Sequence, residues 1–355
     1  MLITGASGFI GRHLAVAFHK KGYPVTVQAR ASSDLTGLAE LPDLRIIYGT
    51  LEDPRWLSSL EKIDIVLHLA LPWSTLNAQT DESFLQTLLV HRPFHLVYFS
   101  SVCAAGLNYC RQPIQETDTE KFPPRFLPHD FYGIYKWKVE EIVKQYARRH
   151  ELNATLLRPT VVYGPGDRKG PLSLFRAIRN DNLMLWHKGE NRISFCAIEN
   201  LVKTTLFLVE HPLLGVRTYH VADPEQMTLK EFCALAAEAM GETLRYRQGS
   251  TVFMKPAASL ARMTNRLGWT RSFADQYGWA QNIVPDITRL FQDYPNLHFT
   301  PTRIALKQAV QYCLSAGDLE RSERFTFGFQ TFTKGLGVLG GIVRSRCKRF
   351  IGRFL

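Results

Sequence analysis

The residues best suited to chemistry are two adjacent serines and a tyrosine–lysine pair. Ser100 and Ser101 end an apolar run typical of a buried strand, and Tyr132 and Lys136 lie four residues apart in a segment with helical spacing. Side chains at i and i+4 share one helical face. A phenol titrates near ~10 when unperturbed, and a neighbouring ammonium favours its ionised form. The set predicts proton exchange between Tyr132 and an alcohol or carbonyl oxygen held by a serine hydroxyl; a surface Tyr–Lys pair without chemistry is the alternative.

A glycine-rich stretch near the start of the chain is typical of a turn that binds phosphates. Residues 4–11 have the sequence TGASGFIG, between a short apolar run and a segment with helical spacing. Glycines let the backbone approach a phosphate closely, and a helix N-terminus offers unpaired N–H groups and the positive end of its dipole. The spacing is GxxGxxG rather than GxGxxG, so an ordinary strand-to-helix turn is the alternative.

The elements that must position these residues alternate along the chain. Apolar runs alternate with helical patterns, and the runs cover residues 1–3, 23–30, 44–48, 63–70, 95–100 and 154–159. This pattern predicts an α/β fold with a doubly wound parallel sheet of the Rossmann type, and ligands at the carboxyl ends of its strands. We expect a dinucleotide-binding domain over 1–163, rejoined by 193–212, then a smaller substrate domain over 164–313 and a basic amphipathic tail over 314–355.

Composition excludes several classes of protein. With 45% hydrophobic and 21% charged residues, the chain of 355 residues is typical of a globular protein rather than a disordered one. No apolar run reaches the ~18 residues of a spanning helix. The six cysteines form no CxxC pair and lie near no histidine at metal-ligand spacing. These observations predict a cytoplasmic protein with reduced thiols and no metal site.

The net charge of +11 is concentrated at the end of the chain. Residues 334–355 hold six basic residues and no acidic one, so only five excess charges remain elsewhere, and we expect no nucleic-acid partner. Apolar residues in this segment recur at spacings of three and four: Leu336, Leu339, Val343, Cys347, Phe350 and Phe354. The pattern predicts an amphipathic segment in peripheral contact with an anionic membrane surface, on its cytoplasmic face. A tail docked on its own domain or on a partner is the alternative.

Five motifs occur in order along the chain: Thr4–Gly11, His68-Leu69-Ala70, Phe99-Ser100-Ser101 with Gly106, Tyr132-Gly133-Ile134-Tyr135-Lys136, and the run from Arg158 to Gly166. In these motifs the sequence resembles the extended short-chain dehydrogenase/reductase family, which includes NAD-dependent epimerases and dehydratases, over residues 1–313. The run 30–35 and Asp53-Pro54 are most similar to the dihydroflavonol-reductase-like and 3β-hydroxysteroid-dehydrogenase-like branch.

The resemblance implies roles for individual residues. Ser101, five residues before Gly106, is the implied catalytic serine, with Ser100 as the second candidate. Tyr132 is the implied acid–base residue, and Lys136 is implied to bind the nicotinamide ribose and to lower the pKa of the tyrosine. The cofactor-binding set is Gly5, Ser7, Gly8, Phe9, Ile10, Gly11, Arg30, Thr50, Leu51, Leu69, Ala70, Ser100, Tyr132, Lys136, Pro159, Val161 and Val162.

Departures from the family narrow the expected reaction. Members that prefer NAD carry an acidic residue where this chain has Ala29, and Arg30 follows it. A guanidinium there favours a 2′-phosphate, so we expect NADP(H), with NAD(H) as the other cofactor and a solvated Arg30 as the alternative interpretation. Thr50 replaces an aspartate near the adenine, which leaves that contact open. Val102-Cys103 replaces the Asp-Glu pair of sugar-nucleotide dehydratases, so dehydration is not expected.

A cluster of large apolar side chains suggests the substrate class. Residues 251–300 include Phe253, Met254, Met263, Leu267, Trp269, Phe273, Tyr277 and Trp279. They favour a pocket for a hydrophobic small molecule, or alternatively the core of the second domain. We therefore expect an NADP(H)-dependent oxidoreductase that interconverts a ketone and a secondary alcohol on a sterol, hopanoid or acyl-type substrate. The alternatives are a sugar-nucleotide epimerase or reductase, and a non-catalytic cofactor-bound scaffold; a homodimer is left open.

Overall fold

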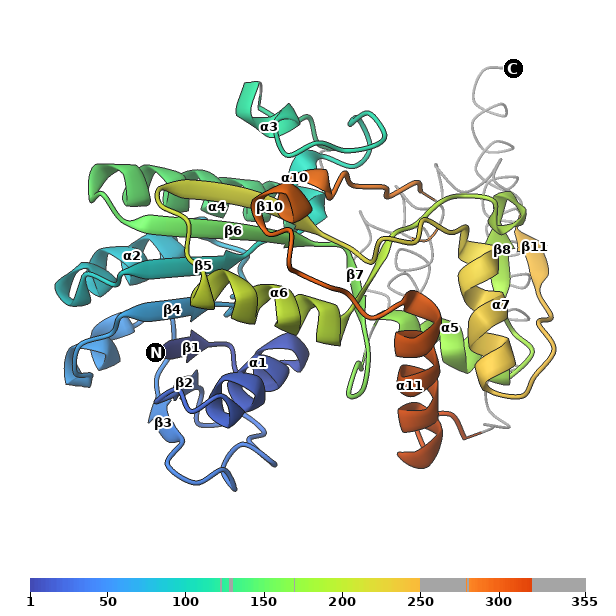
Figure 1. Cartoon of the computed structure of the whole chain (residues 1–355), viewed down its shortest axis with the longest axis horizontal. Helices are drawn as coiled ribbons and strands as arrows, with labels where there is room; N and C mark the ends of the chain where they lie inside the picture. The colour runs from blue at the N-terminus through green and yellow to red at the C-terminus, as the bar shows by residue number, and fades with distance from the viewer. Residues whose placement is uncertain (122, 128–129, 169, 250–278, 280, 321–355) are drawn as a thin grey trace, which may run out of the picture.

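A seven-stranded parallel sheet organises the chain (Figure 1). The computed structural model describes residues 1–121, 123–127, 130–168, 170–249, 279 and 281–320. The strand order is β10-β6-β5-β4-β1-β2-β3, and every adjacent pair is parallel. The strands are β1 (Leu2–Thr4), β2 (Thr26–Ala29), β3 (Arg45–Tyr48), β4 (Ile65–His68), β5 (His95–Phe99), β6 (Asn153–Pro159) and β10 (Val216–Val221). The predicted doubly wound parallel sheet is confirmed.

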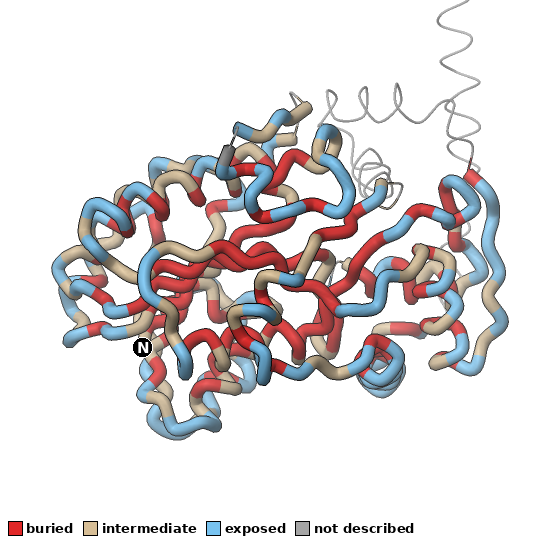
Figure 2. The backbone as a smooth tube through the Cα atoms, turned by 45° about the horizontal axis from the view of Figure 1, so that its top comes forward, coloured by how far each residue is buried: buried red, intermediate tan, exposed pale blue. Residues whose placement is uncertain are grey.

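Helices cover both faces of this sheet, which explains why its strands are nearly continuous apolar runs. Helices α1 (Phe9–Lys20) and α6 (Ile198–Glu210) pack on one face, and α2 (Ala78–Leu88) and α4 (Phe131–Arg149) pack on the other (Figure 1). Successive strand residues point to opposite faces. Accordingly, Leu67 contributes to the core under α1 and α6, whereas its neighbour Val66 contributes to the core under α2 and α4. Figure 2 shows the strands as the buried centre of the molecule.

The edge strand β10 was not expected from the sequence. It pairs with β6 in the register Tyr219↔Leu157 and His220↔Arg158. Thr218 and His220 are buried although both are polar, so the segment does not show the apolar run by which the other strands were recognised. The preceding helix α6 lies within 193–212 and packs beside α1, so this part of the chain returns to the sheet.

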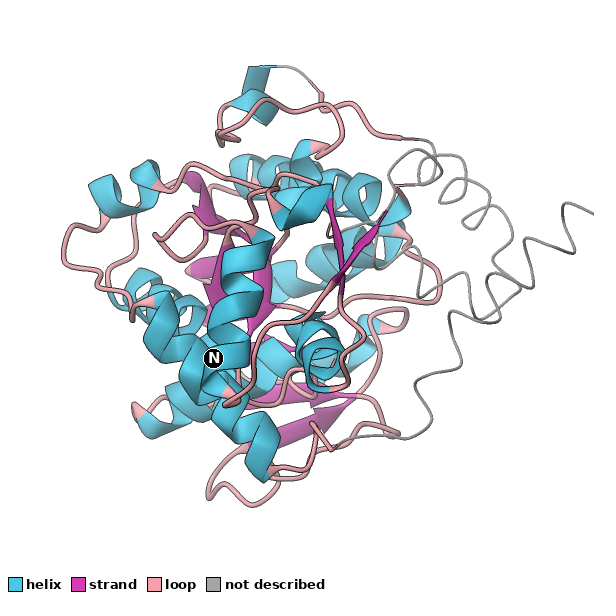
Figure 3. Ribbon diagram, turned by 90° about the vertical axis from the view of Figure 1, so that its right-hand side faces the viewer, coloured by secondary structure: helices cyan, strands magenta, loops and turns pink. Residues whose placement is uncertain are grey.

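Shorter elements form a second layer of structure beyond β6. Strand β7 (Val161–Tyr163) pairs with β9 (Phe195–Ala197), and β8 (Met184–Trp186) pairs with β11 (Arg247–Gly249), both in parallel. A separate apolar core joins α5 (Gly170–Arg179), α7 (Leu229–Ala239) and α11 (Thr302–Ser315), which face the viewer in Figure 3. The remaining elements are η1 (Pro54–Ser59), η2 (Leu89–His91), η3 (Val102–Ala105), α3 (Asp118–Lys121), η4 (His187–Gly189) and α10 (Thr288–Asp293).

Two sequence predictions fall on segments outside the described residues. These are the part of the predicted tail (314–355) that covers 321–355, and the part of the aromatic cluster (251–300) that covers 251–278. The predicted tail begins inside the last turn of α11, and Leu319 packs in the same apolar core as that helix. Of the expected substrate-lining residues, Trp279 is described: it packs against the core of α5, α7 and α11, with its ring stacked on Phe195 at 6.1 Å between centroids. Trp279 therefore belongs to a domain core, the alternative raised for this cluster. In the described part of the chain, no helix has the length and apolar character needed to cross a membrane.

Candidate active site

The glycine turn after β1 has the geometry of a phosphate cradle. Gly5 has φ +70°, and a Cβ there would lie 2.8 Å from the Ala70 backbone nitrogen. A Cβ on Gly11 would clash with the Gly5 carbonyl oxygen, so glycine is what lets α1 approach the turn so closely. Helix α1 has no side-chain cap at Gly8 and no acidic residue in its first turn. Its first N–H groups and the positive end of its dipole are therefore available to an anion, and this turn fits a pyrophosphate.

The predicted cofactor residues lie along one edge of the sheet. Strand β1 lies between β4 and β2. The chain runs from β1 outward through β2 and β3, and then crosses back to β4 on the other side of β1. Dinucleotides bind at such a switch point in parallel sheets. Gly5, Ser7 and Gly8 follow β1, and the first turn of α1 holds Phe9, Ile10 and Gly11. The others follow the same edge: Arg30 after β2, Thr50 and Leu51 after β3, Leu69 and Ala70 after β4, Ser100 after β5, Pro159 at the end of β6, and Val161 and Val162 in β7.

The end of β2 presents positive rather than negative charge. Ala29 is 2% exposed, whereas Arg30 is exposed and its backbone N–H donates to Ser33 Oγ at 3.1 Å. Asp34, in the same loop, lies 3.9 Å from the Arg12 guanidinium and 3.6 Å from that of Arg168. Three guanidinium groups thus accompany one carboxylate, and the local potential favours an anionic ligand.

A close approach between α4 and η3 brings the candidate catalytic hydroxyls together. The Ser101 hydroxyl caps η3 by accepting the Cys103 N–H at 3.2 Å. Asp130 caps α4 by accepting the Gly133 N–H at 3.1 Å. A Cβ on Gly133 would lie 2.8 Å from the Cys103 carbonyl oxygen, so a larger residue would push α4 away from η3. The Tyr132 phenol consequently lies close enough to the Ser101 side chain for the two to interact.

Lys136 lies one helical turn further along α4, under the ends of the strands. Its ammonium donates to the Phe99 carbonyl oxygen at 2.7 Å and to the Tyr98 hydroxyl at 3.4 Å. Burial lowers the pKa of Lys136 to about 8, and the charges of Asp81 and Glu140 oppose that shift. At physiological pH the Lys136 side chain is therefore mostly protonated, and the pH lies near the midpoint of its titration.

The pKa of Tyr132 differs from the sequence expectation. Burial raises the pKa of Tyr132, the nearby Cys103 raises it further, and the interaction with Ser101 lowers it. The lowering expected from Lys136 is not observed in this structure, where the ammonium is bound to Phe99 and Tyr98. Tyr132 is therefore a protonated phenol at neutral pH, which is the form required to donate a proton.

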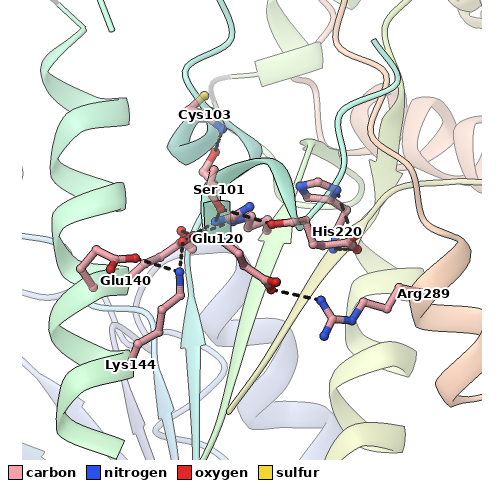
Figure 4. Close-up of polar contacts among 12 residues, drawn as sticks. Ser101, Cys103, Glu120, Glu140, Lys144, His220 and Arg289 are labelled. Carbon is pink, nitrogen blue, oxygen red and sulfur yellow. Dashed lines mark hydrogen bonds and ion pairs between the residues drawn. The ribbon is translucent and has the colours of Figure 1, made fainter. Parts of the chain in front are cut away.

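Ser100 uses its hydroxyl in the protein interior. It donates to Glu140 Oε1 at 2.5 Å, and Glu140 in turn forms a double hydrogen bond with Arg158, at 2.8 and 2.5 Å. Burial alone would raise the pKa of Glu140, but Arg158 beside it holds that pKa below its usual value. Figure 4 shows Glu140 and Lys144 together on α4, below Ser101. Between the two serines, the geometry leaves Ser101 beside Tyr132 and ties Ser100 to the core.

Three neighbours of the site had no role in the sequence analysis. Trp73 stacks on Tyr132 with ring centroids 5.7 Å apart and planes 6° apart, and it is 63% exposed. His68 and Asp81 are fully buried and bonded to each other at 3.1 Å. His68 falls within the motif His68-Leu69-Ala70, which was the one available signal; Trp73 and Asp81 had none. Among the described residues, no three His, Cys, Asp or Glu side chains gather to hold a metal ion.

A glycine turn at the switch point of a parallel sheet, with a serine and a Tyr–Lys helix beside it, defines an NAD(P)-dependent enzyme of the extended short-chain dehydrogenase/reductase type. Residues 1–222 match the sequence profile described as the NAD dependent epimerase/dehydratase family, and the chain belongs to that family. The resemblance found in the sequence is thereby confirmed at the level of the family.

Individual relatives carry out different reactions. N-acetyl-alpha-D-glucosaminyl-diphospho-ditrans,octacis-undecaprenol 4-epimerase of Escherichia coli O157:H7 is 24% identical over 252 residues, which cover 69% of this chain and 73% of that protein. Ceramide reductase of Caulobacter vibrioides (strain NA1000 / CB15N) is 25% identical over 240 residues, which cover 67% and 70%. The solved structure of MoeE5 in complex with UDP-glucuronic acid and NAD matches with a TM-score of 0.69 at 21% identity, over 89% of this chain and 99% of that one, which supports the fold. The branch within the family is not decided by these relatives.

Proposed function

We propose that this protein is an NADP(H)-dependent oxidoreductase that interconverts a ketone and a secondary alcohol on a lipid-like substrate. The observation that carries the proposal is the close approach of α4 to η3, which places Tyr132 beside Ser101 with the buried Lys136 one helical turn away. Val102 and Cys103 follow the serine, so the site lacks the carboxylates that an elimination would require. The positive loop after β2 favours the 2′-phosphate of NADP(H) over a bare ribose.

Each residue has a distinct role in this proposal. When bound, the nicotinamide cofactor supplies or accepts the hydride. Ser101 would hold the substrate oxygen by a hydrogen bond, and Tyr132 would donate a proton to that oxygen during reduction or remove it during oxidation. Lys136 would bind the nicotinamide ribose, and its positive charge would stabilise Tyr132 when the phenol is ionised.

The surface beside Tyr132 supports the proposed substrate class. Trp73 and Phe131 are exposed aromatic side chains, one stacked on Tyr132 and the other preceding it at the start of α4. Such a surface favours an apolar substrate. The similarity to a ceramide reductase supports a lipid-like ketone, with a sterol, hopanoid or acyl-type compound as the class to be tested.

A second candidate is the epimerisation of a sugar nucleotide or lipid-linked sugar. It is favoured by the epimerase of Escherichia coli O157:H7, whose match covers slightly more of both chains than that of the ceramide reductase. Epimerisation returns the hydride to the same substrate, so it consumes no reduced cofactor overall. Net consumption of NADPH therefore separates the two candidates.

The test is a reductase assay with NADPH and a panel of steroid, acyl and sphingoid ketones, read from the absorbance of the reduced nicotinamide. Tyr132→Phe should lower the rate by roughly 10²–10⁴-fold, which is typical for loss of a general acid. Tyr109→Phe, at an exposed phenol, is the matched control. A Tyr132→Phe variant that works at the wild-type rate contradicts the mechanism. Tightly co-purifying NAD, with epimer formation and no NADPH consumption, would favour the second candidate.

A further inference from the structure

Four buried side chains join the strand before the glycine turn to the helix that carries Lys136. Thr4 Oγ1 lies 2.8 Å from His68 Nδ1, and His68 Nε2 lies 3.1 Å from Asp81 Oδ1. The Tyr135 hydroxyl donates to Asp81 Oδ2 at 2.7 Å. These residues come from β1, β4, α2 and α4, and none is more than 2% exposed. The series therefore crosses the sheet from the proposed cofactor turn to the proposed catalytic helix.

The protons along this series are fixed by its hydrogen bonds. Thr4 Oγ1 accepts the backbone N–H groups of Leu69 and Ala70, both at 3.2 Å. Its own proton must then point to His68 Nδ1, which acts as the acceptor. His68 Nε2 is consequently the ring nitrogen that donates to Asp81. Asp81 thus accepts a hydrogen bond at each of its oxygens, one from His68 and one from Tyr135.

Asp81 is the acidic side chain that has the strongest electrostatic influence on Lys136. The Lys136 ammonium bonds directly to uncharged groups, the Phe99 carbonyl and the Tyr98 hydroxyl, and lies 4.9 Å from the Tyr98 ring centroid and 5.9 Å from that of Tyr135. Of the groups that favour its charged form, Asp81 acts most strongly, ahead of Glu140 and Cys103. Glu140 is already neutralised by Arg158 at 2.5 Å. Asp81 therefore supplies the counter-charge for a buried ammonium.

We propose that Asp81 is a positioning residue, which keeps Lys136 in its ammonium form and holds Tyr135 against it, while His68 and Thr4 connect the carboxylate to the backbone beside the glycine turn. The proposal rests on the function proposed above, in which a charged Lys136 binds the cofactor ribose. It adds a residue on α2, bonded to His68 and Tyr135, whose charge acts on Lys136 of α4.

The experiment compares three variants by the titration of the Lys136 side chain, followed by NMR of its ¹⁵N-labelled amine and assigned with Lys136→Arg. Asp81→Asn keeps the shape and removes the charge, so Lys136 should titrate roughly one pH unit lower than in the wild type. Tyr135→Phe removes a hydrogen bond but keeps the carboxylate, so the Lys136 midpoint should stay within a few tenths of a unit. Glu82→Gln, at the neighbouring residue on α2, is the matched control and should leave it unchanged.

Two outcomes overturn the proposal: an Asp81→Asn midpoint equal to that of the wild type, or a Tyr135→Phe shift as large as that of Asp81→Asn. If Asp81→Asn does not fold, the double variant Asp81→Asn with Tyr135→Phe is used, because its new amide faces no phenol. Its Lys136 midpoint is then compared with that of Tyr135→Phe alone. The titration requires no substrate, so its failure leaves the proposed reaction standing. Loss of the reductase reaction would likewise leave the titration result unaffected.

Discussion

Replacing Arg30 with alanine tests whether the end of β2 binds a 2′-phosphate. The Arg30 side chain is exposed, and the loop is held by its backbone bond to Ser33, so the change should leave the fold intact. A hydrogen bond to a charged group contributes about 1.5–3 kcal/mol, and exposure places this one at the lower end. The Kd for NADPH should therefore rise about tenfold, since 1.4 kcal/mol corresponds to a factor of ten. The Kd for NADH, which lacks the phosphate, should change less than about twofold.

A negative charge at position 29, next to Arg30, should weaken the binding of NADPH further. Ala29→Asp introduces the carboxylate that NAD-preferring members carry, and it would lie near the phosphate in place of a methyl group. At ~6 Å, one negative charge repels a doubly charged phosphate by about 1.4 kcal/mol even at the dielectric constant of water. Ala29→Asp with Arg30→Ala should consequently lower the NADPH preference by roughly a hundredfold or more.

Fluorescence titration of both reduced cofactors, at low and moderate salt, provides the measurement. Arg55→Ala is the matched control, because Arg55 is another exposed arginine near the sheet edge that is paired with Asp53 at 2.6 Å. Its cofactor affinities should equal those of the wild type. Equal losses of NADPH and NADH affinity in Arg30→Ala would refute the reasoning, as would a wild-type protein that binds NADH more tightly than NADPH.

Two further predictions concern stability. Glu140→Gln leaves Arg158 buried without its counter-charge, so the free energy of unfolding should fall by about 3–5 kcal/mol, and Glu140→Leu with Arg158→Met should recover most of it in urea titrations. Burial lowers the pKa of His95 to about 4, from an ordinary value of 6.5. The unfolded chain therefore binds more protons below pH 6.5, and stability should fall as the pH falls from 6.5 toward 4, by up to about 3 kcal/mol. His95→Gln should flatten this part of the profile; an equal slope in both proteins would contradict the cause.

The sequence was sufficient to predict most of the sheet, whereas the catalytic roles of Ser101, Tyr132 and Lys136 stay a prediction. Six strands were recognised because burial on both faces makes them continuous apolar runs, as Val66 and Leu67 illustrate from opposite cores. Strand β10 was missed because His220 and Thr218 fill buried positions with polar side chains. The closeness of Ser101 and Tyr132 was predictable from the order of the motifs. Ser101 follows β5, Tyr132 lies in the helix that precedes β6, and both strands end at one edge of the sheet.

The packing adds an independent reason to prefer Ser101 over Ser100. Both residues are buried and both follow β5, and in the sequence only the spacing to Gly106 distinguished them. The difference arises from Glu140 on α4, which accepts the Ser100 hydroxyl, and from the neutralising Arg158 on β6. These partners are 40 and 18 residues apart in sequence from the groups they bind, and only the fold brings them together.

The buried series through Asp81 explains why the glycine turn and helix α4 should behave as one unit. Gly5 has no room for a Cβ because the Ala70 backbone lies against it, and the Ala70 N–H is held by Thr4. The Thr4 hydroxyl is bonded to His68 Nδ1, and His68 Nε2 is in turn bonded to Asp81. A displacement of the turn would therefore act on the carboxylate as well as on the bound phosphate. In this arrangement the same backbone that admits the cofactor also maintains the charge beneath its proposed ribose site.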